Sequence, residues 1–71
     1  MSGISNFKDL VRKPLDEFIA EAKKRGAKYV RVMEIDGEPQ MGTMDYREDR
    51  LNVKVKTRGD QKIVVEVINF S

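Results

Sequence analysis

A long polar connection between two strand-like segments constrains this chain more than any other feature. Tyr29–Met33 is short and rich in β-formers, and Leu51–Lys56 carries an apolar residue at every second position, as expected of strands. Residues 34–49 between them are polar and make a connection of about fifteen residues, a length that is uncommon in compact domains and is usually functional. We therefore expect the other elements to support this connection.

The length of the connection also bears on the sheet. Two strands joined by a wide connection can lie parallel, whereas a tight turn requires antiparallel strands. A last strand, Lys62–Ile68, follows Leu51–Lys56 closely, and the two should form an antiparallel hairpin. The turn between them contains Arg58-Gly59-Asp60, the tripeptide that integrins bind, but a glycine at a turn position explains it more simply.

One helix is predicted over Pro14–Arg25. Proline suits the first helical position, acids occupy the first turn and bases the last, and Gly26 follows as a stop signal. Apolar residues recur at helical spacing along one face. The sequence thus predicts an α+β domain with one helix packed on a small three-stranded mixed sheet and a long exposed loop between two parallel strands. The predicted core comprises Leu15, Phe18, Ile19, Val30, Val32, Leu51, Val53, Val65 and Val67.

Composition narrows the function. The 71 residues allow one domain, 1–71, in which residues 1–6 read as a loose lead. With no Cys and no His, disulfides, zinc sites and thiol or imidazole catalysis are excluded, so we expect no enzyme, no cofactor and no metal. Fourteen basic and twelve acidic residues are intermixed, which does not favour nucleic acid as a partner. No segment is long and apolar enough to span a membrane, and no signal peptide is visible.

The connection carries a motif that runs into the following strand. It reads Thr43-Met44-Asp45-Tyr46-Arg47-Glu48-Asp49-Arg50-Leu51-Asn52-Val53. This stretch resembles the reactive loop and following strand of the potato inhibitor I family of serine-protease inhibitors, most closely in its bacterial members. The resemblance extends to residues 7–14, where an aromatic residue and Leu10-Val11-Arg12-Lys13 stand at the place of the family's aromatic residue and Leu-Val-Gly-Lys. The order of elements agrees over about residues 7–68.

The resemblance implies a function and a site. The family presents an extended, substrate-like loop to a protease, and by position Met44 would enter the primary specificity pocket, with Met44–Asp45 as the scissile-type bond. The protease-binding loop would comprise Gly42, Thr43, Met44, Asp45, Tyr46 and Arg47. Arg50 and Asn52 would support it, Arg50 through Asp45 and Asn52 towards Thr43. A long, unbranched methionine suits the apolar pocket of a subtilisin-like or chymotrypsin-like protease.

Two hypotheses from different classes stay open. The first is a monomeric inhibitor of serine proteases, for which a secreted or periplasmic location would be expected. The second is a non-inhibitory interaction module that uses the same loop, or a sheet edge, on another protein. Preorganisation of the loop separates them, because a stiff loop loses little entropy when it docks.

Overall fold

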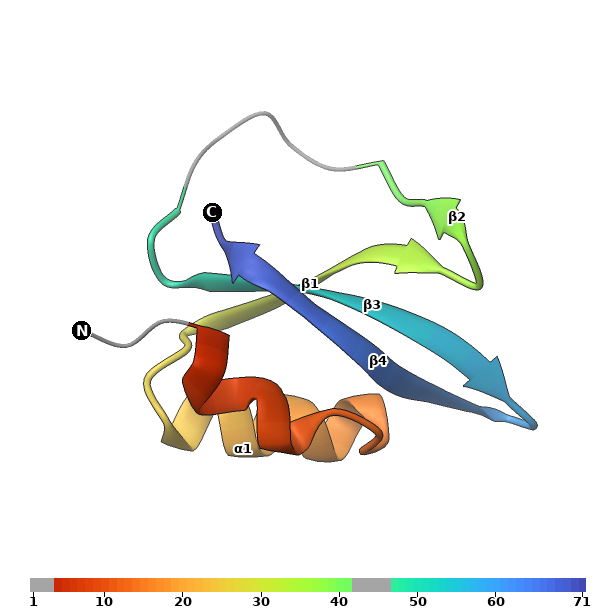
Figure 1. Ribbon diagram of the computed structural model, residues 1–71, viewed down its shortest axis with the longest axis horizontal. Coiled ribbons are helices and arrows are strands. Elements are labelled where there is room, and N and C mark those ends of the chain that lie inside the picture. The colour runs from red at the N-terminus through yellow and green to blue at the C-terminus, as the bar shows by residue number, and fades with distance from the viewer. Residues whose placement is uncertain (1–3, 42–46) are drawn as a thin grey trace.

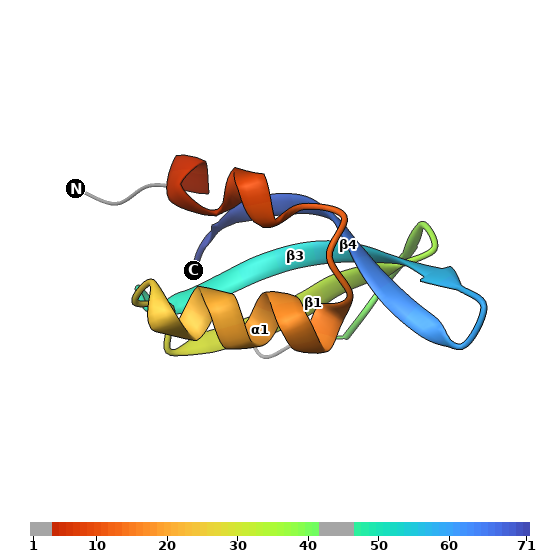
Figure 2. The ribbon, with the colours of Figure 1, turned by 90° about the horizontal axis from the view of Figure 1, so that it is seen from below.

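The computed structural model describes residues 4–41 and 47–71. In chain order, the elements are the 3-10 helix η1 (Ile4–Leu10), the α-helix α1 (Leu15–Lys24) and the strands β1 (Tyr29–Ile35), β2 (Glu38–Pro39), β3 (Arg50–Arg58) and β4 (Gln61–Phe70). The strands form one sheet in the order β2-β1-β3-β4. Both helices lie on one face of this sheet (Figures 1 and 2), and the predicted α+β class is confirmed.

The central strands run as predicted. β1 and β3 are parallel, with Val30 opposite Leu51 and Val32 opposite Val53. β3 and β4 are antiparallel and meet at a two-residue turn in which Gly59 has a φ of 61°. The interpretation of this segment as a hairpin turn is confirmed.

The sheet has a fourth strand that the sequence prediction missed. Asp36 and Gly37 both have positive φ values, 52° and 85°, which is the requirement of a type I′ hairpin turn. The chain therefore folds back after Ile35, and Glu38 pairs with Ile35 in an antiparallel arrangement. The three-stranded prediction was wrong because the Asp-Gly pair was taken as part of the loop.

The N-terminal segment is more ordered than the predicted lead. η1 begins at Ile4, so the description of residues 1–6 as loose fails from that residue onwards. Phe7 and Leu10 on η1 are both buried, and the ring of Phe7 packs edge-on against that of Phe70, 5.5 Å between centroids. An aromatic anchor of this kind holds a short 3-10 segment that its own hydrogen bonds would not stabilise.

The predicted helix is present with slightly narrower bounds. Pro14 has an extended ψ of 147° and precedes the helix, while Arg25 caps its C-terminal end. Pro14 forms an isolated bridge to Ile63 of β4, which explains why its backbone is extended. Phe18 and Ala22, one turn apart, are fully buried against the sheet.

The core lies between the helices and the sheet. Its fully buried side chains include Leu51, Val53 and Val55 of β3, with Val64 and Val67 of β4. Four other predicted core residues, Leu15, Ile19, Val30 and Val32, are half-buried at its margin.

One core prediction is wrong. Val65 is 40% exposed, whereas its neighbour Val64 is completely buried. Lys54 of β3 pairs with Glu66 and the next residue, Val55, pairs with Val64. Val65 is therefore an extra residue in β4, without a partner on β3. A β-bulge of this kind changes which side chains face the core, and simple alternation along β4 therefore selects the wrong valine.

Candidate functional site

The predicted protease-binding loop is only partly within the described residues. Arg47 is described, whereas Gly42, Thr43, Met44, Asp45 and Tyr46 lie outside the described residues. The described parts of the site are the two flanks of the loop and the start of β3, which follows it in the chain.

The N-terminal flank follows β2. The amide of Gln40 donates a hydrogen bond to the carbonyl oxygen of Met33, at 2.8 Å, which fixes the chain beside β1 at that point. Met41, the next residue, is fully exposed. The chain thus leaves the sheet immediately after a backbone hydrogen bond.

The C-terminal flank is tied to the start of β1. The carbonyl oxygen of Asp49 accepts hydrogen bonds from the amides of Lys28 (3.1 Å) and Tyr29 (3.2 Å). The guanidinium of Arg47 lies over the Tyr29 ring, 5.4 Å from its centroid, a cation–π arrangement. Both flanks of residues 42–46 are therefore held by β1.

β3, which follows the connection in the chain, carries buried polar side chains at its start. Because Leu51, Val53 and Val55 face the helices, alternation places Arg50 and Asn52 on the opposite face of the sheet. Arg50 is 8% exposed and Asn52 only 1%. Polar groups are retained at such burial when their hydrogen bonds are satisfied.

Asn52 is the centre of a hydrogen-bond network across three strands. Its Oδ1 accepts a bond from Nε of Arg31 on β1, at 3.0 Å. Its Nδ2 donates to Oδ1 of Asn69 on β4 (2.9 Å) and to Oγ of Ser71 (2.7 Å). One amide therefore connects β1, β3 and the C-terminal residues.

Arg50 is attached to the same C-terminal residues. Its Nε donates to the carbonyl oxygen of Ser71 (2.9 Å), and the amide of Ser71 donates to the carbonyl oxygen of Arg50 (3.0 Å). The sequence indicated Arg50 and Asn52 as supports, and both lie at the predicted place on β3. Their expected acceptors Asp45 and Thr43 lie outside the described residues.

Sequence reasoning missed Arg31, Asn69 and Ser71 as members of this network. The available signals were a cation within the β-rich segment and polar residues after the last apolar run. Neither signal identifies a partner by itself, because cross-strand neighbours depend on register.

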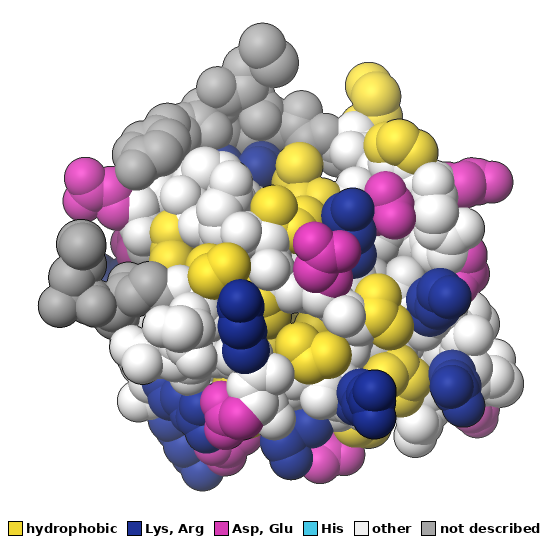
Figure 3. Space-filling view, in the orientation of Figure 1, with side chains coloured by type: hydrophobic (Ala, Val, Ile, Leu, Met, Phe, Trp, Pro, Cys, Tyr) yellow, Lys and Arg dark blue, Asp and Glu magenta, His cyan; other side chains and the backbone are white. Residues whose placement is uncertain are grey.

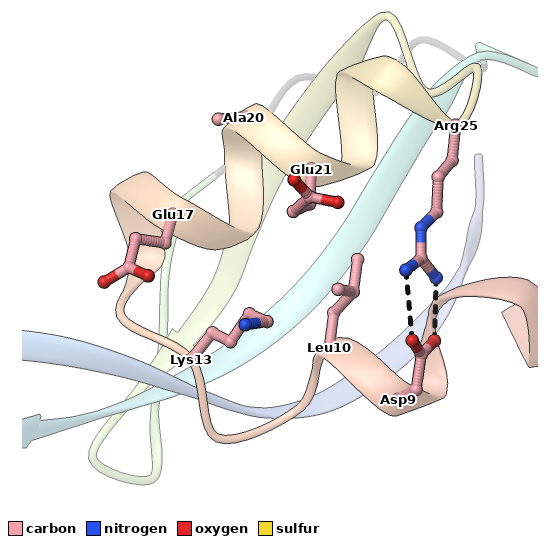
Figure 4. Close-up of a pocket in the computed structure, with 7 residues that line it drawn as sticks. All are labelled: Asp9, Leu10, Lys13, Glu17, Ala20, Glu21 and Arg25. Atoms are coloured by element: carbon pink, nitrogen blue, oxygen red, sulfur yellow. Dashed lines mark hydrogen bonds and ion pairs between the residues drawn. The ribbon is translucent and has the colours of Figure 1, made fainter.

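Two carboxylates have lowered pKa values, and each connects two segments of the chain. The amide and the hydroxyl of Thr57 both donate hydrogen bonds to Asp36, each at 2.7 Å. The amide and, next in size, the hydroxyl lower the pKa of Asp36, and the charges of Lys62 and Lys56 lower it further. Asp9 forms a two-pronged pair with Arg25 (2.7 and 3.0 Å), whose hydrogen bonds lower the pKa of Asp9 (Figure 4). Asp36 thus connects the β1–β2 turn to β3, and Asp9 connects η1 to the end of α1.

The described residues hold no group of three or more Cys, His, Asp or Glu side chains that could bind a metal ion. None of their helices has the length and apolar character needed to cross a membrane.

Comparison of the chain with models of protein families, with curated proteins and with solved structures gives no match.

Proposed function

We propose that this protein is a substrate-like inhibitor of serine proteases that have an apolar primary pocket, of the subtilisin or chymotrypsin type. The loop around Met44–Asp45 would occupy the protease cleft. The observation that carries the proposal is the buried polar pair Arg50 and Asn52, which lies on β3 directly after the connection and is bonded to Ser71.

This pair supports an inhibitory role for a physical reason. A loop that is fixed before docking loses less conformational entropy on binding, and if its peptide bond is cut, ends held in place favour religation over release. Buried donors fixed by a second segment of the chain are suited to this, since they cannot relax towards water.

The residue proposed for the primary pocket decides the class of protease. Methionine is long, unbranched and apolar, so it matches a pocket lined by apolar groups and leaves a buried pocket acid unpaired. Met44 would thus make the chain a poor inhibitor of trypsin-like enzymes.

The test is a titration of subtilisin, chymotrypsin and trypsin with the protein and with its Met44→Lys variant. The parent should inhibit the first two, and Met44→Lys should move the preference towards trypsin, because a buried pocket acid favours a cation. Met41→Lys is the matched control, since Met41 is fully exposed on the flank of the loop, and it should leave the preference unchanged.

Two results would contradict the proposal. One is a parent protein that inhibits none of the three enzymes at micromolar concentration. The other is a Met44→Lys variant with the preference of the parent. In either case the non-inhibitory interaction module takes the place of the inhibitor.

A further inference from the structure

A second surface lies at the end of the sheet where β3 and β4 meet in their hairpin. Arg12, Lys56, Arg58, Ile63 and Val65 line a hollow of about 510 Å³ there. Figure 3 shows basic and hydrophobic side chains side by side over this end of the hairpin. These five residues are called the basic-apolar patch below.

None of the three cations of the patch takes part in an ion pair among the described residues, although Lys56 lies near enough to Asp36 to help lower the pKa of that carboxylate. The neighbouring acids are engaged or lie outside the hollow. Asp36 accepts two hydrogen bonds from Thr57, and Glu66 pairs with Lys54 at 3.7 Å. Asp60, in the hairpin turn, is not part of the lining. The lining of the hollow itself therefore carries three cations and no carboxylate, which favours an anionic ligand.

Two residues of the patch stand out, one by its backbone conformation and one by its exposure. Arg12 has a φ of 84°, a left-handed conformation that is unfavourable for any residue with a Cβ and that glycine adopts freely. Its amide donates a hydrogen bond to the carbonyl oxygen of Val64 on β4, at 2.7 Å. An arginine here costs conformational energy, and such outliers persist most often at functional positions.

Val65 is the second of these residues. The β-bulge in β4 turns this aliphatic side chain out of the core and leaves it 40% exposed. Together with the half-buried Ile63, it gives the hollow an apolar part in addition to its three cations. A ligand held by charge alone would not need this apolar part.

We propose that the basic-apolar patch binds an acidic peptide segment of a partner protein, with an aliphatic side chain of the segment on Ile63 and Val65 and carboxylates beside the three cations. Nucleic acid fits less well, because the lining has no aromatic side chain on which bases could stack. A membrane fits less well, because the patch has only two apolar side chains, Ile63 and Val65, and membrane binding grows with the apolar area buried.

The position of the patch makes it independent of the proposed inhibition. The hairpin lies at the opposite end of β3 from Arg50 and from the flank at residues 47–49 (Figure 1). A protease on the loop would leave the patch accessible. The patch can therefore bind its acidic partner while a protease occupies the loop.

The test is a nuclear magnetic resonance titration with two blocked peptides, Glu-Glu-Leu-Glu-Glu and its Gln-Gln-Leu-Gln-Gln counterpart. The acidic peptide should shift the backbone amides of the patch residues, and the neutral peptide should not. Arg12→Gly should lower the affinity for the acidic peptide by roughly three- to fivefold, since one of three exposed cations is lost. The same variant should not melt at a lower temperature than the parent, because glycine removes the unfavourable φ.

Loss of binding without loss of stability separates a ligand contact from a structural role. The matched control is Lys24→Ala, which removes an exposed cation of α1 outside the patch and should leave the affinity unchanged. Four results would each overturn the proposal: no localised shifts, equal binding of the neutral peptide, an Arg12→Gly variant that binds like the parent, or tighter binding to phosphatidylserine vesicles or to a single-stranded oligonucleotide.

Discussion

Replacing Asn52 with alanine tests the polar network at the start of β3. The change removes an amide that is 1% exposed. It eliminates the bond from Arg31 and the two shortest bonds to the C-terminal residues, those to Asn69 and Ser71. No apolar contact replaces them, because alanine is too short to reach these partners.

The size of the effect follows from the kinds of bonds lost. A neutral hydrogen bond contributes about 0.5–1.5 kcal/mol and one to a charged group about 1.5–3 kcal/mol. The partners Asn69 and Arg31 are exposed and half-exposed, respectively, so water can replace part of what they lose. We therefore expect Asn52→Ala to lower the free energy of unfolding by about 2–4 kcal/mol.

This loss is large for so small a domain. At roughly 0.05–0.15 kcal/mol per residue, a chain of 71 residues has a total stability of about 4–11 kcal/mol. Urea denaturation followed by circular dichroism measures the change, provided that the slope with denaturant is the same for both proteins.

The matched control is Lys54→Ala, at the next position on the same face of β3. Lys54 makes only two long ion pairs, 3.9 Å to Glu34 and 3.7 Å to Glu66, and its side chain is 35% exposed. Its removal should cost less than about 1 kcal/mol. If Asn52→Ala is no more destabilising than Lys54→Ala, the argument that the network holds β1, β3 and the C-terminal residues together is refuted.

Three further predictions follow from individual contacts. Val64→Ala should cost about 2–3 kcal/mol of stability and Val65→Ala less than about 0.5 kcal/mol, because only Val64 is buried; equal denaturation midpoints would contradict the register of β4. The pKa of Asp9 is lowered by its pairing with Arg25, so the stability that this pair contributes is present above pH 3.8, the ordinary pKa, and is lost as the pH falls through the lower folded-state pKa. Asp9→Asn should therefore flatten this part of the acid-denaturation curve. Identical curves for the two proteins would refute the assignment. Arg50→Ala should stay folded yet be hydrolysed faster by bound subtilisin, measured by mass spectrometry, whereas equal hydrolysis would mean that Arg50 does not brace the loop.

The sequence was sufficient where local pattern decides the structure. The apolar stripe and the flanking Pro14 and Gly26 identify α1 to within a residue at each end, because helix periodicity and caps are local signals. The long connection correctly indicated parallel central strands. These predictions do not depend on which residues meet across the sheet.

The sequence was insufficient where register decides the structure. The bulge that exchanges Val65 for Val64 in the core has no local signal, since both residues are valines in one apolar run. The same holds for the partners of Asn52, because Arg31 and Ser71 are brought to it only by the pairing of β1 and β4 with β3. The β2 strand differs, since its Asp-Gly turn is a recognisable hairpin signal that was not used.

The polar residues at the two ends of β3 differ in burial and in bonding. At its start, Arg50 and Asn52 are buried and bonded to neighbouring segments, so their donors are fixed in direction. Towards its end, Lys56 and Arg58 are exposed, with no ion pair among the described residues. Fixed donors suit a loop that must keep one shape, whereas exposed cations suit a partner that is attracted from solution. Arg12 lies between η1 and α1, and its amide donates to the carbonyl oxygen of Val64 on β4 (2.7 Å). Its replacement removes none of the bonds described above for Arg50 and Asn52, so the Arg12→Gly variant should inhibit proteases as well as the parent does.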